Sequence, residues 1–137
     1  MEFYPYDMTL FCKEKDRVTG KERYRRIYFY GIDWQERVGV KYLKYTNSSV
    51  DNDTNILIFV PYRTDLEYLK PKEYAQLEDK TNYYTFNIHD KIVKGIIDFN
   101  VETVKDLRDL ELKFDCVINI IKISNCDIFG HFELECE

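Results

Sequence analysis

Glycine and proline are scarce in this sequence, with five glycines and three prolines among 137 residues. Loops that bind phosphate groups need clustered glycines, because only then can backbone N–H groups approach the anion closely. The glycines here are scattered and form neither a G-x-x-x-x-G-K-[ST] nor a G-x-G-x-x-G pattern. This excludes those nucleotide-binding motifs, and the low content of both residues indicates a folded chain rather than a linker.

Grouped metal ligands are missing as well. Zinc sites need clustered cysteine and histidine, whereas His89 and His131 lie far from each other and no C-x-x-C pair is present. His131 and Glu133 share one face of a predicted strand, but a pair at that spacing occurs in too many sequences to indicate a metal site. We therefore predict no metal and no cofactor. The four cysteines, which we expect to be reduced and buried, are Cys12, Cys116, Cys126 and Cys136.

One segment matches only the first part of a calcium-binding loop. Residues 51–55 have the D-x-D-x-N opening of such a loop, but Ile56 stands where the loop needs glycine and no glutamate occupies its twelfth position. This excludes an EF-hand. A solvated acidic turn is favoured over a looser calcium site.

No catalytic pattern is present either. A G-x-S-x-G motif is absent, and although Cys126 and His131 lie close enough around a predicted turn to meet, a chance neighbour is favoured over a catalytic pair. With 25 acidic residues, pairs of carboxylates are inevitable and do not identify a glycosidase. We predict that the chain is not an enzyme.

Long apolar runs are also lacking. No segment approaches the roughly 20 apolar residues of a membrane span, and residues 1–7 lack the basic and apolar regions of a signal peptide. We expect no membrane contact and folding in a cytosol. The net charge of −5 argues against general attraction to nucleic-acid phosphates.

What is abundant is the alternation of apolar and polar residues typical of strands, bounded by turn formers. The pattern predicts a mainly β fold, a small β-barrel or sandwich of seven to nine short strands with two short helices, in one domain over residues 1–137. The expected strands cover residues 8–12, 22–32, 37–45, 56–60, 83–86, 92–93, 96–101, 116–123 and 131–137.

Several local features are expected within this fold. Residues 31–34 should turn the chain between two strands, and the polar residues 46–54 should form a loop. The uninterrupted apolar run 56–60 is typical of a central strand covered on both faces. Helices are predicted at 71–78, where Pro71 suits the first turn, and after Thr103, where Thr103 and Asp106 have capping-box spacing.

One cluster of basic and aromatic residues stands out. Side-chain alternation puts Tyr24, Arg26, Tyr28 and Tyr30 on one face of a strand and Arg25 on the other. Tyrosine and arginine are enriched at protein interfaces, so a partner contact is one interpretation; a plain amphipathic strand and an RNA-stacking surface are the others. The candidate interface residues are Tyr24, Arg25, Arg26, Tyr28, Tyr30 and Trp34.

Five motifs, taken in order, resemble a family of small proteins. That family is encoded in the structural modules of tailed bacteriophages and prophages of low-GC Gram-positive bacteria, and the pattern is similar to head-closure (stopper) and head–tail connector proteins. The motifs are Thr9-Leu10-Phe11; Arg25-Arg26-Ile27 leading into Gly31-Ile32-Asp33-Trp34; Tyr83-Tyr84-Thr85-Phe86; Asp90-Lys91-Ile92-Val93-Lys94-Gly95; and Gly130-His131-Phe132-Glu133-Leu134. The family commonly has glycine before the aspartate of the fourth motif, where this chain has His89.

The resemblance implies a virion structural protein, assembled in the bacterial cytoplasm as a homo-oligomeric ring between portal or adaptor and tail-completion proteins. DNA would be passing cargo that is not bound specifically, and an acidic passage would let it slide. The loop 46–54 would then reach into the channel or a neighbouring ring, through Ser48, Ser49, Asp51, Asn52 and Asp53.

Other functions stay open on the residues alone. The chain could instead be a minor capsid or decoration protein, or a monomeric cytosolic binding module encoded by the same kind of genome. A small hydrolase or sugar-binding barrel with scattered carboxylates is a third class.

Overall fold

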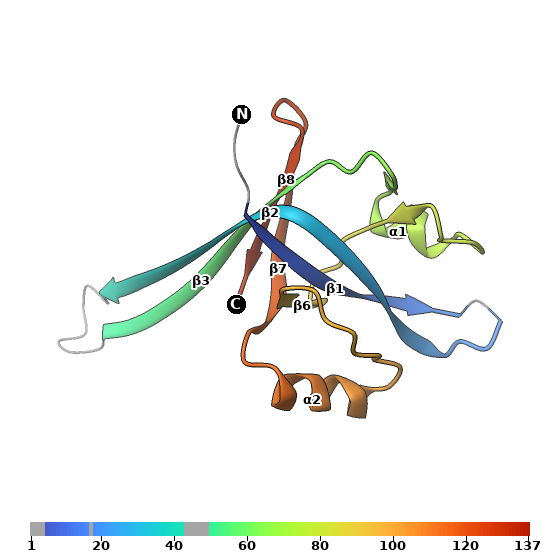
Figure 1. Ribbon diagram of the computed structural model, residues 1–137, viewed down its shortest axis with the longest axis horizontal. Coiled ribbons are helices and arrows are strands. Elements are labelled where there is room, and N and C mark those ends of the chain that lie inside the picture. Colours follow the sequence, from blue (N-terminus) through green and yellow to red (C-terminus); the bar gives the residue numbers. More distant parts are fainter. Residues whose placement is uncertain (1–4, 17, 43–49) are drawn as a thin grey trace.

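The computed structural model describes residues 5–16, 18–42 and 50–137, with the backbone alone for 37–42 and 50–55 (Figure 1). In this part of the chain there are eight strands and two helices. Their bounds are β1 Tyr6–Lys15, β2 Glu22–Tyr42, β3 Val50–Pro61, β4 Glu67–Tyr68, α1 Pro71–Ala75, β5 Tyr83–Tyr84, β6 Lys91–Lys94, α2 Val104–Lys113, β7 Val117–Cys126 and β8 His131–Cys136.

Six of the strands form a closed barrel in the order β1-β2-β3-β8-β7-β6, and all neighbours are antiparallel. The short strands β4 and β5 pair separately and in parallel. The prediction of a mainly β fold with two short helices is confirmed, and the architecture is a barrel rather than a sandwich. Closure gives each barrel strand two partners, which removes open sheet edges there.

The first strand pair is longer than the sequence predicted. Lys15 pairs with Glu22, so the connecting turn covers only residues 16–21. Gly20 adopts a φ of 70°, a left-handed conformation that glycine accepts without strain.

The predicted turn at residues 31–34 is wrong, because β2 runs through it without a break. Tyr6 pairs with Ile32 and Asp7 with Tyr30, which leaves Gly31 as the extra residue of a β-bulge with a φ of 69°. Asp7 accepts a hydrogen bond from the Gly31 N–H at 3.1 Å. Glycine therefore bends the strand here, and at this bulge β2 exchanges its partner β1 for β3.

The apolar run at 56–60 lies in β3, between β2 and β8, as a central strand should. Ile56, Ile58 and Val60 are buried, whereas Leu57 and Phe59 are only half-buried. The run is therefore covered fully on the inner face alone, which corrects the expectation of two covered faces.

The barrel interior follows the alternation read from the sequence. Phe132, Leu134 and Cys136 of β8 are buried, as predicted, and the residues between them are more exposed. Ile27 and Phe29 of β2 belong to the same core. Each such side chain stabilises the fold by about 1.5–3 kcal/mol through removal of apolar area from water.

Helix α2 covers the outside of the barrel (Figure 1). Its capping box forms as predicted: Thr103 accepts from the Asp106 N–H, and the Asp106 side chain accepts from the Thr103 N–H. Leu110 packs with Phe11 and Val93, which point outward from the barrel. Because α2 covers these outward residues, β1 is buried on both faces from Met8 to Cys12.

Residues 96–101 do not form the predicted strand; this stretch is irregular. It is fastened by single hydrogen bonds instead, since the Ile97 N–H donates to Thr9 Oγ1 at 3.1 Å and Ile97 O accepts from the Tyr28 hydroxyl at 2.8 Å. Side chains thus take the place of a strand partner.

The excursion from residue 62 to residue 90 closes one side of the barrel with aromatic rings. Helix α1 is shorter than predicted, and the strand expected at 83–86 is limited to β5. Tyr84 and Phe86 are buried and pack on Phe29, with ring centroids 5.6 and 5.5 Å apart. All four cysteines are free, with Cys12 and Cys136 buried and the other two half-buried.

Candidate functional site

The outer face of β2 carries four of the predicted interface residues. Tyr28 holds residue 97, and the Arg26 guanidinium lies 2.9 Å from Asn100 Oδ1 and 3.2 Å from Asp98 Oδ1. Tyr24 packs on the cluster under α2. Tyr30 is 65% exposed and is the member of this row that remains open to solvent.

The other two predicted interface residues face inward. Trp34 is 5% exposed and belongs to the core, and Arg25 is held by groups of the excursion. The predicted interface residues between Tyr24 and Trp34 therefore lie in three environments: the outer face of β2, the contact with the excursion, and the core. A partner that approached this face of β2 would meet Tyr30 first.

The predicted loop at 46–54 also changes. Ser48 and Ser49 lie outside the described residues, but Asp51, Asn52 and Asp53 belong to β3 and pair with Lys41, Val40 and Gly39. The prediction of a loop is wrong for residues 50–54. Pairing with β2 satisfies the backbone N–H and C=O groups that face β2 and outweighs the turn propensity of Asp and Asn.

These residues belong to a projecting β2–β3 arm, defined as residues 37–42 of β2 and 50–55 of β3. Strand β1 pairs with β2 only up to Ile32, and β8 pairs with β3 only from Ile56 onward. In the described part of the chain, the two strands of the arm thus pair only with each other. Figure 1 shows the arm leaving the barrel on the side opposite the β1–β2 hairpin.

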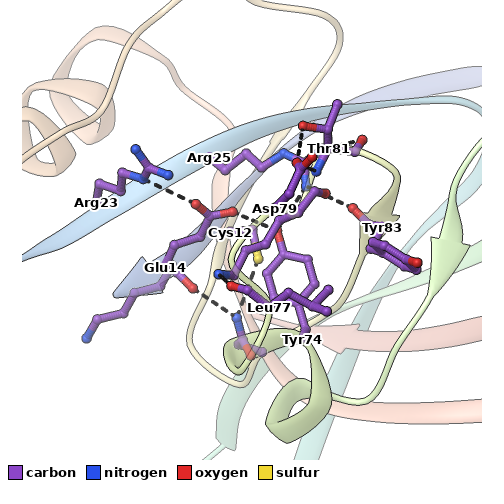
Figure 2. Close-up of polar contacts among 12 residues, drawn as sticks. Cys12, Glu14, Arg23, Arg25, Tyr74, Leu77, Asp79, Thr81 and Tyr83 are labelled. Carbon is purple, nitrogen blue, oxygen red and sulfur yellow. Dashed lines mark hydrogen bonds and ion pairs between the residues drawn. The ribbon is translucent and has the colours of Figure 1, made fainter. Parts of the chain in front are cut away.

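A second feature is a buried polar network on the α1 side of the barrel, which we call the Glu14 network (Figure 2). Glu14 is 6% exposed and accepts from the Tyr74 hydroxyl at 2.6 Å and from Arg23 Nε at 3.3 Å. Burial, the largest cause, raises the pKa of Tyr74, so its hydroxyl stays a donor.

Arg25 is the centre of this network. Its Nη1 lies 3.0 Å from the Tyr74 hydroxyl, 2.6 Å from Lys80 O and 2.8 Å from Tyr83 O, and Nη2 lies 3.2 Å from Thr81 O. Three backbone carbonyls of the excursion thus converge on one guanidinium (Figure 2). The arrangement clamps the segment after α1 to β2.

Asp90 lies beside this network and is 3% exposed. The Lys13 N–H donates to its Oδ1 at 3.2 Å, and Asn87 Nδ2 donates to its Oδ2 at 3.0 Å. Burial nevertheless dominates and raises the pKa of Asp90 to about 7. Burial also raises the pKa of the neighbouring Cys12 thiol, so both groups are largely protonated in mildly acidic solution.

Asp90 follows a turn in which the Asp90 N–H donates to Asn87 O at 3.2 Å. His89, which precedes Asp90, adopts a φ of 76°. The backbone conformation that glycine favours is thus present here with a histidine, at a cost of about 1 kcal/mol.

A hollow of about 420 Å³ opens next to Glu14, with Arg23, Leu77 and Lys80 among its lining residues. Both oxygens of the Glu14 carboxylate already accept hydrogen bonds inside the protein. These hydrogen bonds join β1 to β2 and α1, so the Glu14 network holds these elements together.

A third group was only half visible in the sequence. Cys126, His131 and Glu133 have thiol, imidazole and carboxylate atoms within 4.8 Å of one another, next to the turn of the β7–β8 hairpin. The sequence indicated that His131 and Glu133 share a face, and that Cys126 and His131 could meet. The hairpin register, which pairs Cys126 with His131, combines these two observations.

These observations define a class: a closed six-stranded antiparallel β-barrel with a projecting two-stranded arm. Residues 3–137 match a family described as "Family of unknown function (DUF6751)", and the chain belongs to that family. No curated protein and no solved structure matches the chain. Within the described residues, no helix has the length and apolar character needed to cross a membrane.

Proposed function

We propose that the protein is a structural subunit of the head–tail junction of a tailed bacteriophage, where copies form a ring around the DNA passage. The ring would join portal or adaptor proteins to tail-completion proteins and act through protein–protein contacts, without catalysis. The observation that carries this proposal is the β2–β3 arm, which extends beyond every other strand of the barrel.

An arm of this kind needs a partner for physical reasons. A two-stranded hairpin alone is marginally stable in water, and here both outer edges lack a strand partner among the described residues. Unpaired strand edges are templates for pairing with another chain. A neighbouring copy in a ring supplies such a chain at every position, because a head-to-tail contact repeats until the ring closes.

The arm sequence supports the same conclusion. In the sequence, Val38, Val40 and Tyr42 alternate with arginine, glycine and lysine. Alternation of apolar with other residues is typical of a strand that has one covered face. A barrel can therefore offer the arm to a neighbour while its own core stays complete.

The charge supports the role of DNA as passing cargo. The chain carries 25 acidic against 20 basic residues, for a net charge of −5. A ring of such subunits repels phosphates overall, which opposes tight binding and favours sliding. This accords with a passage rather than with a nucleic-acid clamp.

Mass spectrometry of purified virions tests the location. In particles produced from the genome that encodes this chain, we expect the protein in several copies per particle, in a fixed ratio to the portal protein. Absence from the particles would contradict the proposal and would favour the monomeric cytosolic module.

Shortening the arm tests the mechanism. A variant in which residues 37–55 are replaced by Asn-Gly removes the whole arm, keeps the pair Glu36–Ile56 and closes it with a two-residue turn suited to hairpins. We expect the barrel to fold with little change in stability. Heads should fill with DNA but fail to join tails, which electron microscopy of the particles measures.

The matched control shortens another hairpin by the same means. Replacing residues 16–21 by Asn-Gly retains the pair Lys15–Glu22 and leaves the arm intact. This variant should still give tailed particles. Normal tail joining by the arm-shortened variant would instead favour a decoration or minor capsid subunit.

A further inference from the structure

We propose that Cys126, His131 and Glu133 form a binding site for a single zinc ion at the turn end of the β7–β8 hairpin. Within the described residues, they are the one group of three cysteine, histidine or acidic side chains whose ligand atoms lie within 4.8 Å of one another. The proposal is independent of the proposed ring, since it rests on a different part of the barrel.

The hairpin brings the three side chains together through its register. Cys126 is the last residue of β7, His131 is the first of β8, and the two pair directly across the strands. Directly paired residues of an antiparallel sheet point to the same face, and Glu133, two positions further along, points there as well. The connecting turn is short, and Gly130 takes a φ of 68° in it.

The distance between two of the ligand atoms matches a tetrahedral ion. His131 Nε2 and Glu133 Oε1 lie 3.4 Å apart. Two ligand atoms each about 2.1 Å from a tetrahedral zinc ion would be separated by about 3.4 Å. The separation of these two atoms therefore fits a shared zinc ion, and the Cys126 sulfur lies within the same 4.8 Å cluster.

The donor set selects the metal. One sulfur, one nitrogen and one oxygen are the three ligand types that zinc accepts, and three protein ligands leave a fourth position for water or another group. Calcium and magnesium prefer oxygen ligands throughout, so a thiolate and an imidazole discriminate against them.

The imidazole is held in place by aromatic rings. Phe59 meets the His131 ring edge-on at 5.4 Å, and Phe129 stacks on it at 6.0 Å. The His131 side chain is only 15% exposed, whereas Glu133 is 37% exposed. The site thus combines a fixed, sheltered nitrogen ligand with a carboxylate that an ion from solvent can reach.

The alternative is a metal-free ion pair between His131 and Glu133 beside a neutral thiol. An ordinary cysteine thiol has a pKa of about 8.5, so at neutral pH and without a metal ion its sulfur is mostly protonated. Zinc binds the thiolate and displaces that proton. The state of the Cys126 sulfur therefore distinguishes the two interpretations.

The first experiment titrates the full chain with Zn²⁺, and with Co²⁺ as a spectroscopic probe. We expect one ion per chain and an absorption band that reports a sulfur–cobalt bond. Cys126→Ser should abolish that band, and Cys126→Ser and His131→Gln should each weaken zinc binding more than about 100-fold, since even loss of an outer partner costs 10–100-fold.

Matched controls use the same residue types outside the site. Cys116→Ser and His89→Gln each remove one potential ligand elsewhere, and both should bind zinc like the unaltered chain. Equal zinc binding by Cys126→Ser and the unaltered chain would overturn the proposal, as would a cobalt complex without the sulfur band.

A second measurement needs no variant and so does not depend on variant folding. The rate of alkylation of Cys126 in the unaltered chain is followed by peptide mass spectrometry, with and without zinc. Zinc should slow alkylation of Cys126 at least about tenfold and leave Cys116 unchanged. Equal rates with and without zinc would overturn the proposal.

Discussion

The Glu14 network and the Cys126 hairpin cluster both combine acidic and basic side chains, yet different shares of their hydrogen-bonding groups are used within the chain. In the network, the Glu14 carboxylate and the Arg25 guanidinium form hydrogen bonds with other groups of the same chain. In the hairpin cluster, His131 and Glu133 share one contact of 3.4 Å. Side chains whose hydrogen-bonding groups are used by the same chain stabilise the fold. Side chains that converge but still have free hydrogen-bonding or ligand atoms can bind a ligand.

The largest expected effect on stability comes from a substitution in the Glu14 network. Arg25→Ala leaves three carbonyls and the Tyr74 hydroxyl without their charged donor, and partly buried groups that lose a charged partner are costly. We expect a loss of about 3–5 kcal/mol in the free energy of unfolding, measured by urea denaturation.

Two control variants set the scale for this loss. Lys13→Ala removes a side chain that is 48% exposed and pairs with the equally exposed Glu22, and Glu133→Gln alters one that is 37% exposed in the hairpin cluster. Each should cost about 1 kcal/mol or less, because solvent screens exposed charges. Equal losses in all three variants would remove the distinction between the two clusters.

The next effect is on pH dependence and comes from Asp90, next to the Glu14 network. Its pKa is raised to about 7 in the folded protein, against about 3.9 in an unfolded chain. The folded state therefore holds a proton that the unfolded state has lost. The stabilisation is complete below about pH 4 and is lost as the pH rises through about 7.

Asp90→Asn isolates this contribution, because asparagine does not titrate. Between about pH 4 and pH 7, the unaltered chain should lose about 2–4 kcal/mol of stability relative to the variant, since each pKa unit corresponds to about 1.4 kcal/mol. Urea denaturation at a series of pH values measures the difference. Parallel stability curves for the two proteins would show that Asp90 titrates normally.

The smallest effect relieves backbone strain beside Asp90. His89→Gly places glycine at a φ of 76° and removes a side chain that is exposed. Relief of the left-handed conformation should raise stability by up to about 1 kcal/mol, reduced by the greater freedom of glycine in the unfolded chain. Thermal unfolding measures the gain, and His89→Ala, which keeps the strain, should not show it.

Much of the fold could be predicted because it depends on local patterns. The alternation in β8 gave the correct inward residues, and the Thr103–Asp106 spacing gave the correct start of α2. What failed depended on distant pairing. Gly31 is compatible with a turn or with a bulge, and only the partners β1 and β3 decide between them.

For the candidate sites too, local patterns could be predicted from the sequence and distant contacts could not. Tyr24, Arg26 and Tyr28 could be placed on one face from alternation, but their contacts with the α2 side depend on tertiary packing. Asp51 to Asp53 look like a loop until β2 pairs with them. For Cys126, His131 and Glu133, a usable signal was present, because two overlapping pairs around one predicted turn imply a group of three.

The continuity of β2 has a mechanical consequence. Its 21 residues, at about 3.3 Å each, form one continuous strand about 70 Å long when measured along the chain. Arg25 anchors one end to the excursion, and the other end is the arm. Since no loop interrupts β2, a force applied to the arm is transmitted directly to the barrel. The bulge at Gly31 is the point at which the strand can bend in response.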